Sequence, residues 1–252
     1  MGLALDSFED IFSFLRKHPK VILLAFTFSI LSTLFSSMLA QSIKTLDLVS
    51  ISILVALGII LFFVSLIVAG VYQITVYQAV KKGEVEIMKA VQNSFGIFFK
   101  ILLTSLLTFL IFGVPVFFVF LLALLLLKSS LIIFIVILVI VLCILFILFY
   151  VSLRLFLTFP ILVIENKDPI ESIKSSWKIT KDNSISILAF LLLLGLIIGV
   201  ISFPFSILKV VFEILKIDQI SLIFEVIIST ISGALLGPAA AIYYFNLKKS
   251  KI

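Results

Sequence analysis

Six stretches of this chain contain no charged residue, and each is long enough to cross a lipid bilayer as a helix. They are residues 21–43, 48–80, 101–127, 129–153, 183–208 and 226–247. A membrane-spanning helix needs about 20 apolar residues. Because lipid offers the backbone no hydrogen-bond partner, each spanning segment must satisfy its own N–H and C=O groups, as an α-helix does. The sequence therefore predicts an all-α, polytopic integral membrane protein with six transmembrane helices.

The composition excludes a water-soluble alternative. Hydrophobic residues make up 63% of the chain, and the mean hydropathy is +1.41. A helix on the surface of a soluble protein needs a polar face, and these six stretches have none. Since the stretches account for most of the sequence, we expect residues 1–252 to form a single six-span membrane domain without a soluble catalytic domain.

The positive charges predict an orientation. If the N-terminus, the second and fourth connections and the C-terminus share one side, that side holds all of the 19 Lys and Arg residues except Lys44, Lys128, Lys209 and Lys216. Such an excess is typical of cytoplasmic segments. We therefore expect a multi-pass protein of the cell membrane with both termini in the cytoplasm. Acidic residues interrupt the basic ones, which argues against nucleic acid as a partner.

Three segments on that side share a pattern. Residues 6–11, 83–88 and 168–173 each read as a start residue, a spacer, an apolar residue, Glu, a spacer and an apolar residue. Each segment precedes two spans, so we predict three cytoplasmic interfacial amphipathic helices and a threefold internal repeat with units of about 3–80, 81–165 and 166–247. The alternative is that any short connection between spans is amphipathic.

The third copy has the best helix-start chemistry. Asp168 is suited to cap the first turn, Pro169 suits the first helical position, and Glu171 completes a capping box. The spacing i, i+3, i+7 puts three apolar side chains on one face of this helix, namely Ile170, Ile173 and Trp177.

Several spans carry signals for close packing or bending. The small-xxx-small pairs Gly195/Gly199 and Gly233/Gly237 permit neighbouring helices to approach closely. Pro115 and Pro238 are expected to kink the third and sixth spans. Such breaks occur at substrate sites of transporters, but they are also ordinary packing features. The apolar pattern around residues 209–218 predicts a short interfacial helix on the outer side.

Arg154 directly follows the fourth stretch, about one turn from the end of the fourth span, and Pro160 comes six residues later. Its guanidinium can extend toward the interface, which lowers the cost of placing it there. We predict a structural ion pair between Arg154 and Glu165. The alternative is that Arg154 binds a lipid phosphate.

No catalytic, metal or cofactor site is predicted. His18 is the only histidine and Cys143 the only cysteine, which argues against multi-histidine metal sites, cysteine metal sites and a serine–histidine triad. Nucleotide-binding glycine loops and the serine-hydrolase elbow are also missing. We therefore expect a protein that is not an enzyme.

Residues 154–180 resemble a known membrane domain. In this stretch an arginine leads to a proline and a glutamate, followed by a short helix with Ser176-Trp177 near its end. The arrangement is similar to the membrane domain found ahead of some bacterial glycerophosphodiester phosphodiesterases, and to its stand-alone relatives of unknown function. The resemblance implies a membrane domain without hydrolysis, because this chain lacks the phosphodiesterase domain. The residues it singles out as structural or lipid-contact candidates are Arg154, Pro160, Glu165, Asp168, Glu171 and Trp177.

The leading hypothesis is a non-enzymatic membrane protein that binds lipid or a partner protein at the cytoplasmic interface. Three amphipathic segments and few polar groups within the spans favour it. A small transporter or lipid translocator is the second hypothesis, and a subunit of a membrane complex or a homo-oligomer is the third.

Overall fold

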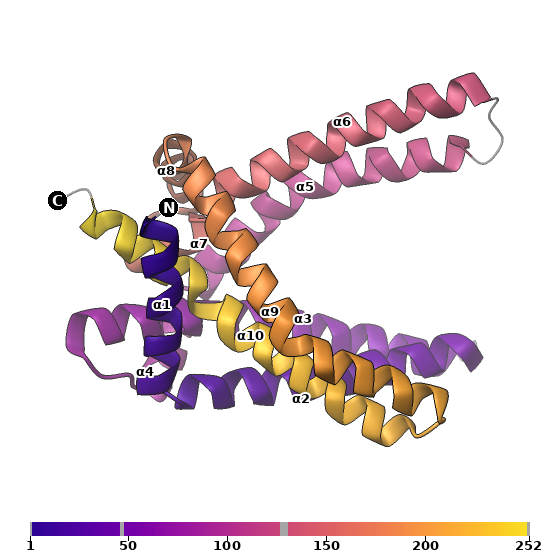
Figure 1. Ribbon diagram of the computed structural model, residues 1–252, viewed down its shortest axis with the longest axis horizontal. Helices are drawn as coiled ribbons and strands as arrows, with labels where there is room; N and C mark the ends of the chain where they lie inside the picture. Colours follow the sequence, from indigo (N-terminus) through magenta and orange to yellow (C-terminus); the bar gives the residue numbers. More distant parts are fainter. Residues whose placement is uncertain (1, 46–47, 127–130, 251–252) are drawn as a thin grey trace. The chain divides into compact units, whose positions relative to one another are not determined.

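The computed structural model describes residues 2–45, 48–126 and 131–250. Within these ranges the chain is helical and contains no strand (Figure 1). The helices are α1 (Gly2–Lys17), α2 (Lys20–Thr45), α3 (Leu48–Lys82), α4 (Ile87–Gly96), α5 (Phe98–Leu126), α6 (Leu131–Leu155), α7 (Thr158–Ile164), α8 (Pro169–Lys181), α9 (Ser184–Ile214) and α10 (Asp218–Lys249).

Six segments are long and apolar enough to cross a membrane. They are Lys20–Ser42, Ser50–Lys82, Phe98–Leu122, Ile135–Ile164, Ser184–Ile214 and Asp218–Lys249. Few of their side chains are buried, and large apolar ones such as Phe109, Phe146 and Leu192 are exposed. Apolar surface of this extent, on helices long enough to cross a bilayer, is typical of a membrane protein. The prediction of an all-α, multi-pass membrane protein with six helices that could span a membrane is confirmed.

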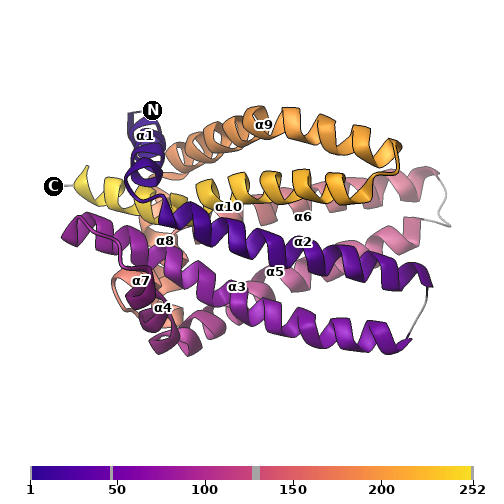
Figure 2. The same ribbon diagram turned by 90° about the horizontal axis from the view of Figure 1, so that it is seen from below.

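The described residues form two compact units, Met1–Phe98 with Leu188–Ile252, and Phe99–Ile187. The first contains α1 to α4, most of α9, and α10. In it, α10 packs against α1, α2 and α3, and α4 packs against α3 (Figure 2). The second contains most of α5, then α6, α7 and α8, with α8 packed against both α6 and α7. Neither unit coincides with a predicted repeat unit, and the threefold repeat and the single domain stay predictions.

Close packing explains why α10 is central to the first unit. A Cβ atom added at Gly237 would lie 2.7 Å from the ring of Tyr72 on α3, and one added at Gly233 would lie 3.7 Å from Ala25 on α2. Gln73 Nε2 also donates a hydrogen bond to the Gly237 carbonyl at 3.2 Å. The predicted close approach at this glycine pair is therefore confirmed.

The connection between α9 and α10 differs from the prediction. The fifth span continues as one helix to Ile214, and α10 already begins at Asp218. No separate interfacial helix occupies the predicted region, because α9 itself runs through it to Ile214. Within α9, Lys209 Nζ lies 3.7 Å from Glu213 Oε1, one turn farther on. The chain reverses at Lys216, which adopts a left-handed conformation with φ of 57°.

The prolines predicted to kink two spans are accommodated inside them. Pro115 lies within α5 and Pro238 within α10, and both helices continue past the proline. Neither helix has the interruption that a discontinuous transporter helix would show.

All three segments with the shared glutamate pattern lie at or next to short helices, but the pattern occupies different positions in each. Asp6 lies inside α1, Gly83 follows α3 with φ of 75°, and only Asp168 is the residue that precedes its helix. The pattern is therefore not a common helix-start signal, because α1 begins before it and α4 begins near its end. The interfacial location of α1, α4 and α8 stays a prediction.

Candidate functional site

Arg154 is a buried charge at the end of a long apolar helix. It lies in the last turn of α6 and is 7% exposed. In the part of the chain that the structure describes, no other Lys, Arg, Asp or Glu side chain is buried. Buried charges are rare and are normally compensated by a partner, which makes this residue the natural centre of a candidate site.

Helix α8 attaches to the Arg154 backbone through small hydroxyl side chains. The Arg154 carbonyl oxygen accepts hydrogen bonds from Ser176 Oγ at 2.7 Å and from Thr180 Oγ1 at 3.2 Å. Carbonyl groups at the end of a helix lack intrahelical donors, so these hydroxyls satisfy a group that the fold would otherwise leave open. Ser172, Ser176 and Thr180 recur every four residues and form the buried face of α8.

Two aromatic side chains flank the guanidinium. Arg154 Cζ lies 4.7 Å from the ring centroid of Tyr150 and 5.8 Å from that of Trp177. The two rings meet edge to face at 6.3 Å. Arg154 Nη2 also donates a hydrogen bond to the Tyr150 hydroxyl. Cation–π contacts of this kind contribute about 0.5–2 kcal/mol each, so the aromatic rings stabilise the charge but do not neutralise it.

Two of the three guanidinium nitrogens have no hydrogen-bond partner. Arg154 Nε and Nη1 are both inaccessible and unbonded in the described structure, and so is Thr158 Oγ1, four residues farther on. No carboxylate among the described residues forms an ion pair with Arg154. A guanidinium buried in this state carries a desolvation cost that a counter-ion would offset. The cluster of Arg154, Tyr150 and Trp177 is called the arginine cluster below.

The predicted ion pair between Arg154 and Glu165 is wrong. Glu165 Oε2 instead lies 2.6 Å from Lys167 Nζ. The reason is local: Asn166 adopts a left-handed conformation with φ of 50°, which asparagine tolerates better than most residues. The resulting turn brings Lys167 back toward Glu165, while Arg154 is held between its aromatic neighbours.

The predicted capping box at the start of α8 is also wrong in part. Asp168 precedes the helix and Pro169 takes its first position, as expected, but the Asp168 side chain makes no capping hydrogen bond. Asp168 Oδ1 lies 3.5 Å from Lys100 Nζ on α5 instead. Lys100 Nζ also donates to the Asn166 carbonyl at 3.2 Å. The lysine thus competes with the helix terminus for this carboxylate, and Glu171 remains exposed in the first turn.

The remaining candidate, Pro160, is buried in α7. It is the third residue of this short helix, where a missing backbone N–H costs little because first-turn N–H groups have no intrahelical acceptor. Pro160 therefore has a structural position in α7, six residues after Arg154 in the chain.

Sequence reasoning missed four residues around the site. Tyr150 precedes Arg154 by four positions on the same helix, and this spacing alone predicts a contact between the two side chains. Ser176 and Thr180 share the i, i+4 spacing, which marks a common face without naming its partner. Lys100 carries no local signal, because its contact with the turn at Asn166 is long-range.

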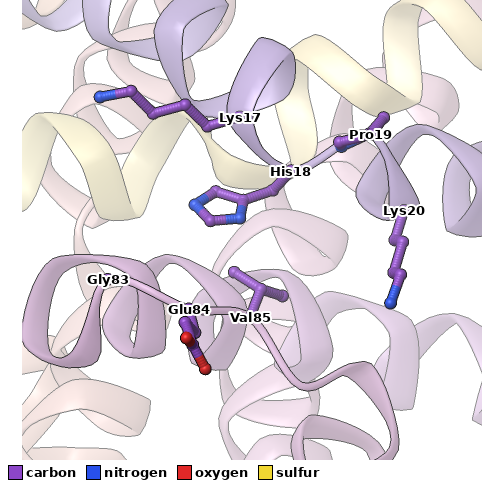
Figure 3. Close-up of a pocket in the computed structure, with 7 residues that line it drawn as sticks. All are labelled: Lys17, His18, Pro19, Lys20, Gly83, Glu84 and Val85. Atoms are coloured by element: carbon purple, nitrogen blue, oxygen red, sulfur yellow. The ribbon is translucent and has the colours of Figure 1, made fainter.

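The first unit contains a hollow that is a separate candidate site. It lies between the turn that joins α1 to α2 and the turn that follows α3 (Figure 3). It has a volume of about 400 Å³ and is lined by Lys17, His18, Pro19, Lys20, Gly83, Glu84 and Val85. Partial burial, and then the neighbouring Lys17, lower the pKa of His18 from its ordinary value of 6.5. In Figure 3 the His18 ring points into the hollow, while the Glu84 carboxylate and the Lys17 ammonium point away from it. The charges do not converge, so this hollow is a weaker candidate than the arginine cluster.

The described residues contain no group of His, Cys, Asp and Glu side chains that could hold a metal ion. Comparison with curated proteins gives no match, and comparison with solved structures gives none either. The resemblance to the membrane domain of glycerophosphodiester phosphodiesterases stays a prediction. A family model does match residues 4–244. Because the match covers nearly the whole chain, this protein with six candidate membrane spans belongs to the family described as a domain of unknown function, DUF7847.

Proposed function

We propose that this protein is a non-enzymatic integral membrane protein of the cell membrane that binds lipid through its short helices at the cytoplasmic interface. The supporting observation is the surface of α8. Its buried face consists of hydroxyl residues, whereas the apolar side chains Ile170 and Trp177 are 57% and 42% exposed. A helix in water would bury the apolar face, but a helix at the membrane interface places that face against acyl chains.

Helices α1 and α4 support the same proposal. In α4 the buried residues are Ala90 and Ser94, while Met88 and Phe95 are exposed. In α1, Leu5 and Phe12 are exposed although other apolar residues of this helix are buried. Each short helix therefore presents large apolar side chains outward, as an interfacial helix does.

The position of α8 is testable because Trp177 is the only tryptophan in the chain. The protein is reconstituted in vesicles of phosphatidylcholine that carries bromine, a contact quencher, either near the headgroup or near the end of the acyl chain. We expect shallow bromine to quench Trp177 fluorescence more than deep bromine does. Quenching by neither lipid, together with full quenching by aqueous iodide, would place α8 in water and contradict the proposal.

The orientation has a separate test. Replacing Cys143, the only cysteine, by serine leaves a background for single-cysteine labelling. In the double variant Cys143→Ser/Ser184→Cys a label would report on the start of α9, and in Cys143→Ser/Lys178→Cys on an exposed position of α8. We expect a membrane-impermeant maleimide to label neither in intact cells and the α8 cysteine after lysis. Labelling of the α8 cysteine from outside would reverse the proposed topology.

Lipid translocation is the second candidate function, and Arg154 favours it, because a buried cation in a span commonly marks a pathway for anionic groups. The test is transfer of a fluorescent anionic lipid between the leaflets of proteoliposomes, followed by dithionite reduction. Transfer that stops on replacing Arg154 with glutamine would support translocation over simple binding. Binding of a partner protein predicts cross-links in membranes, and binding of a second copy predicts a cross-linked dimer.

A further inference from the structure

We infer that the arginine cluster binds a phosphate group, and that the phosphate belongs to an anionic lipid. The inference rests on the proposed position of α8 at the membrane interface, because that position brings lipid headgroups to the level of Trp177. It adds to the proposed function a specific site and the chemical class of its ligand.

The first argument is that the guanidinium lacks an anion. Arg154 is buried, its Nε and Nη1 have no hydrogen-bond partner, and one aromatic hydroxyl takes the third nitrogen. The two nearest acidic residues along the chain already have cations beside them, since Glu165 pairs with Lys167 and Asp168 lies beside Lys100. The charge of Arg154 is therefore left for a ligand from outside the protein.

The second argument is the match between the unpaired donors and phosphate. Nε and Nη1 lie on different edges of the planar guanidinium, each edge being completed by Nη2, so each edge presents one open donor to an oxygen of a phosphate or carboxylate. Thr158 Oγ1, which is also buried and unbonded, lies four residues farther along the chain. Open donors on two edges of the guanidinium suit a ligand with more than two oxygens, which favours phosphate over carboxylate.

The third argument concerns access. Tyr150 and Trp177, which cover the guanidinium, are each about two-fifths exposed. Because neither ring is buried, we expect either to be able to turn aside for a ligand, while Ser176 and Thr180 hold the buried face of α8 in place. Tyrosine and tryptophan at this level of a membrane protein are themselves typical neighbours of lipid headgroups.

The experiment uses vesicles made from phosphatidylcholine and phosphatidylglycerol in one fixed ratio. In one preparation only the phosphatidylglycerol is brominated, and in the other only the phosphatidylcholine. The charge of the surface is identical, so the two preparations differ only in which lipid quenches Trp177. We expect stronger quenching by brominated phosphatidylglycerol, after correction for its mole fraction, and therefore a preference ratio above one.

Three variants test the assignment to Arg154. Arg154→Gln should lower the ratio to one, and Arg154→Lys should give an intermediate ratio, because lysine keeps the charge but loses the planar set of donors. Lys178→Gln is the matched control, since Lys178 is an exposed cation in the last turn of α8, next to Trp177 in the chain, and it should keep the wild-type ratio. If Arg154→Gln and Lys178→Gln lowered the preference ratio equally, the anionic lipid would be attracted by the surface charge in general, and the inference would be overturned.

A fourth variant keeps the inference testable if Arg154→Gln does not fold. Tyr150→Phe removes the hydroxyl that occupies Nη2 and leaves the cation in place, so the ratio should persist or rise. A ratio of one in this variant would overturn the inference, because the tyrosine and not the arginine would then be the lipid contact.

The same assay separates the two sources of phosphate. Excess inorganic phosphate in the buffer should leave the ratio unchanged if the ligand is a lipid headgroup. A ratio abolished by phosphate but kept in chloride of equal ionic strength would assign the cluster to free phosphate. A ratio abolished by both salts would indicate simple screening and overturn the inference. If both brominated lipids quench equally, only the phosphate site fails, whereas absence of quenching by either lipid would contradict the interfacial position of α8.

Discussion

Helices α9 and α10 carry the same pair of glycines at the same spacing, yet the two pairs have opposite environments. In α10, Gly233 and Gly237 lie against α2 and α3, and Gly237 contacts the Tyr72 ring so closely that no side chain fits. In α9, a Cβ atom added at Gly195 or Gly199 would meet nothing within 4 Å among the described atoms. The predicted close packing is therefore confirmed for α10 and wrong for α9.

The two helices are held in different ways. Helix α10 is anchored along its backbone, through the glycine contacts and the hydrogen bond from Gln73. Helix α9 reaches α10 through side chains: the ring centroids of Phe190 and Tyr243 are 5.0 Å apart, those of Phe212 and Phe224 are 5.6 Å apart, and Lys209 pairs with Glu225 at 3.0 Å. The comparison teaches that small-xxx-small spacing permits close approach, while the neighbouring helices decide whether it occurs.

The largest effect is expected at the side-chain anchor of α9. Phe190 is fully buried against Tyr243, so Phe190→Ala should destabilise the protein by about 3–5 kcal/mol through lost contacts and a cavity. The measurement is loss of the monodisperse gel-filtration peak after heating in detergent. Leu192→Ala is the control, because Leu192 is 65% exposed on the same helix. Equal effects of the two substitutions would show that α9 has no anchored face.

The next largest effect is expected at the backbone contact of α10. Gly237→Ala places a methyl group 2.7 Å from the Tyr72 ring. Because Tyr72 is itself buried, relieving this overlap should cost about 1–3 kcal/mol. The same heating assay measures it. Gly233→Ala, where the added methyl meets Ala25 at an ordinary 3.7 Å, should be close to neutral. If Gly237→Ala left the stability unchanged, the close backbone contact would not distinguish α10 from α9.

A smaller effect of opposite sign is expected at the glycines of α9. Gly195→Ala and Gly199→Ala fill open space and remove a residue with poor helix propensity. They should leave stability unchanged or raise it by up to about 1 kcal/mol. Destabilisation by more than this in the same assay would mean that a second molecule packs on these glycines.

The smallest effect is expected at the ion pair between α9 and α10. Glu225→Gln removes the 3.0 Å contact with Lys209. Both side chains are about one-third exposed, so the loss should be within about 0–1 kcal/mol and should shrink further as salt is added. The measurement is thermal stability at low and high ionic strength. A loss that is larger and insensitive to salt would show that this pair is a main anchor of α9.

The candidate site divides in the same manner between local and long-range information. The order of residues alone places Arg154 near the end of the fourth span and predicts that α8 begins after Asp168 with a proline. The order of residues does not predict the partners of Arg154. The two residues that flank it, Tyr150 and Trp177, are aromatic and lie on different helices. Charge complementarity suggested Glu165, but the turn at Asn166 places Lys167 beside that carboxylate instead.

Local composition by itself determined the helical class and the six apolar segments, because a backbone in lipid has only one way to satisfy its own polar groups over such lengths. Tertiary structure alone decided which glycines touch a neighbour, which cation stays unpaired and which face of α8 is buried. These outcomes depend on contacts between segments far apart in the chain, and a spacing within one helix specifies a face without specifying what that face meets.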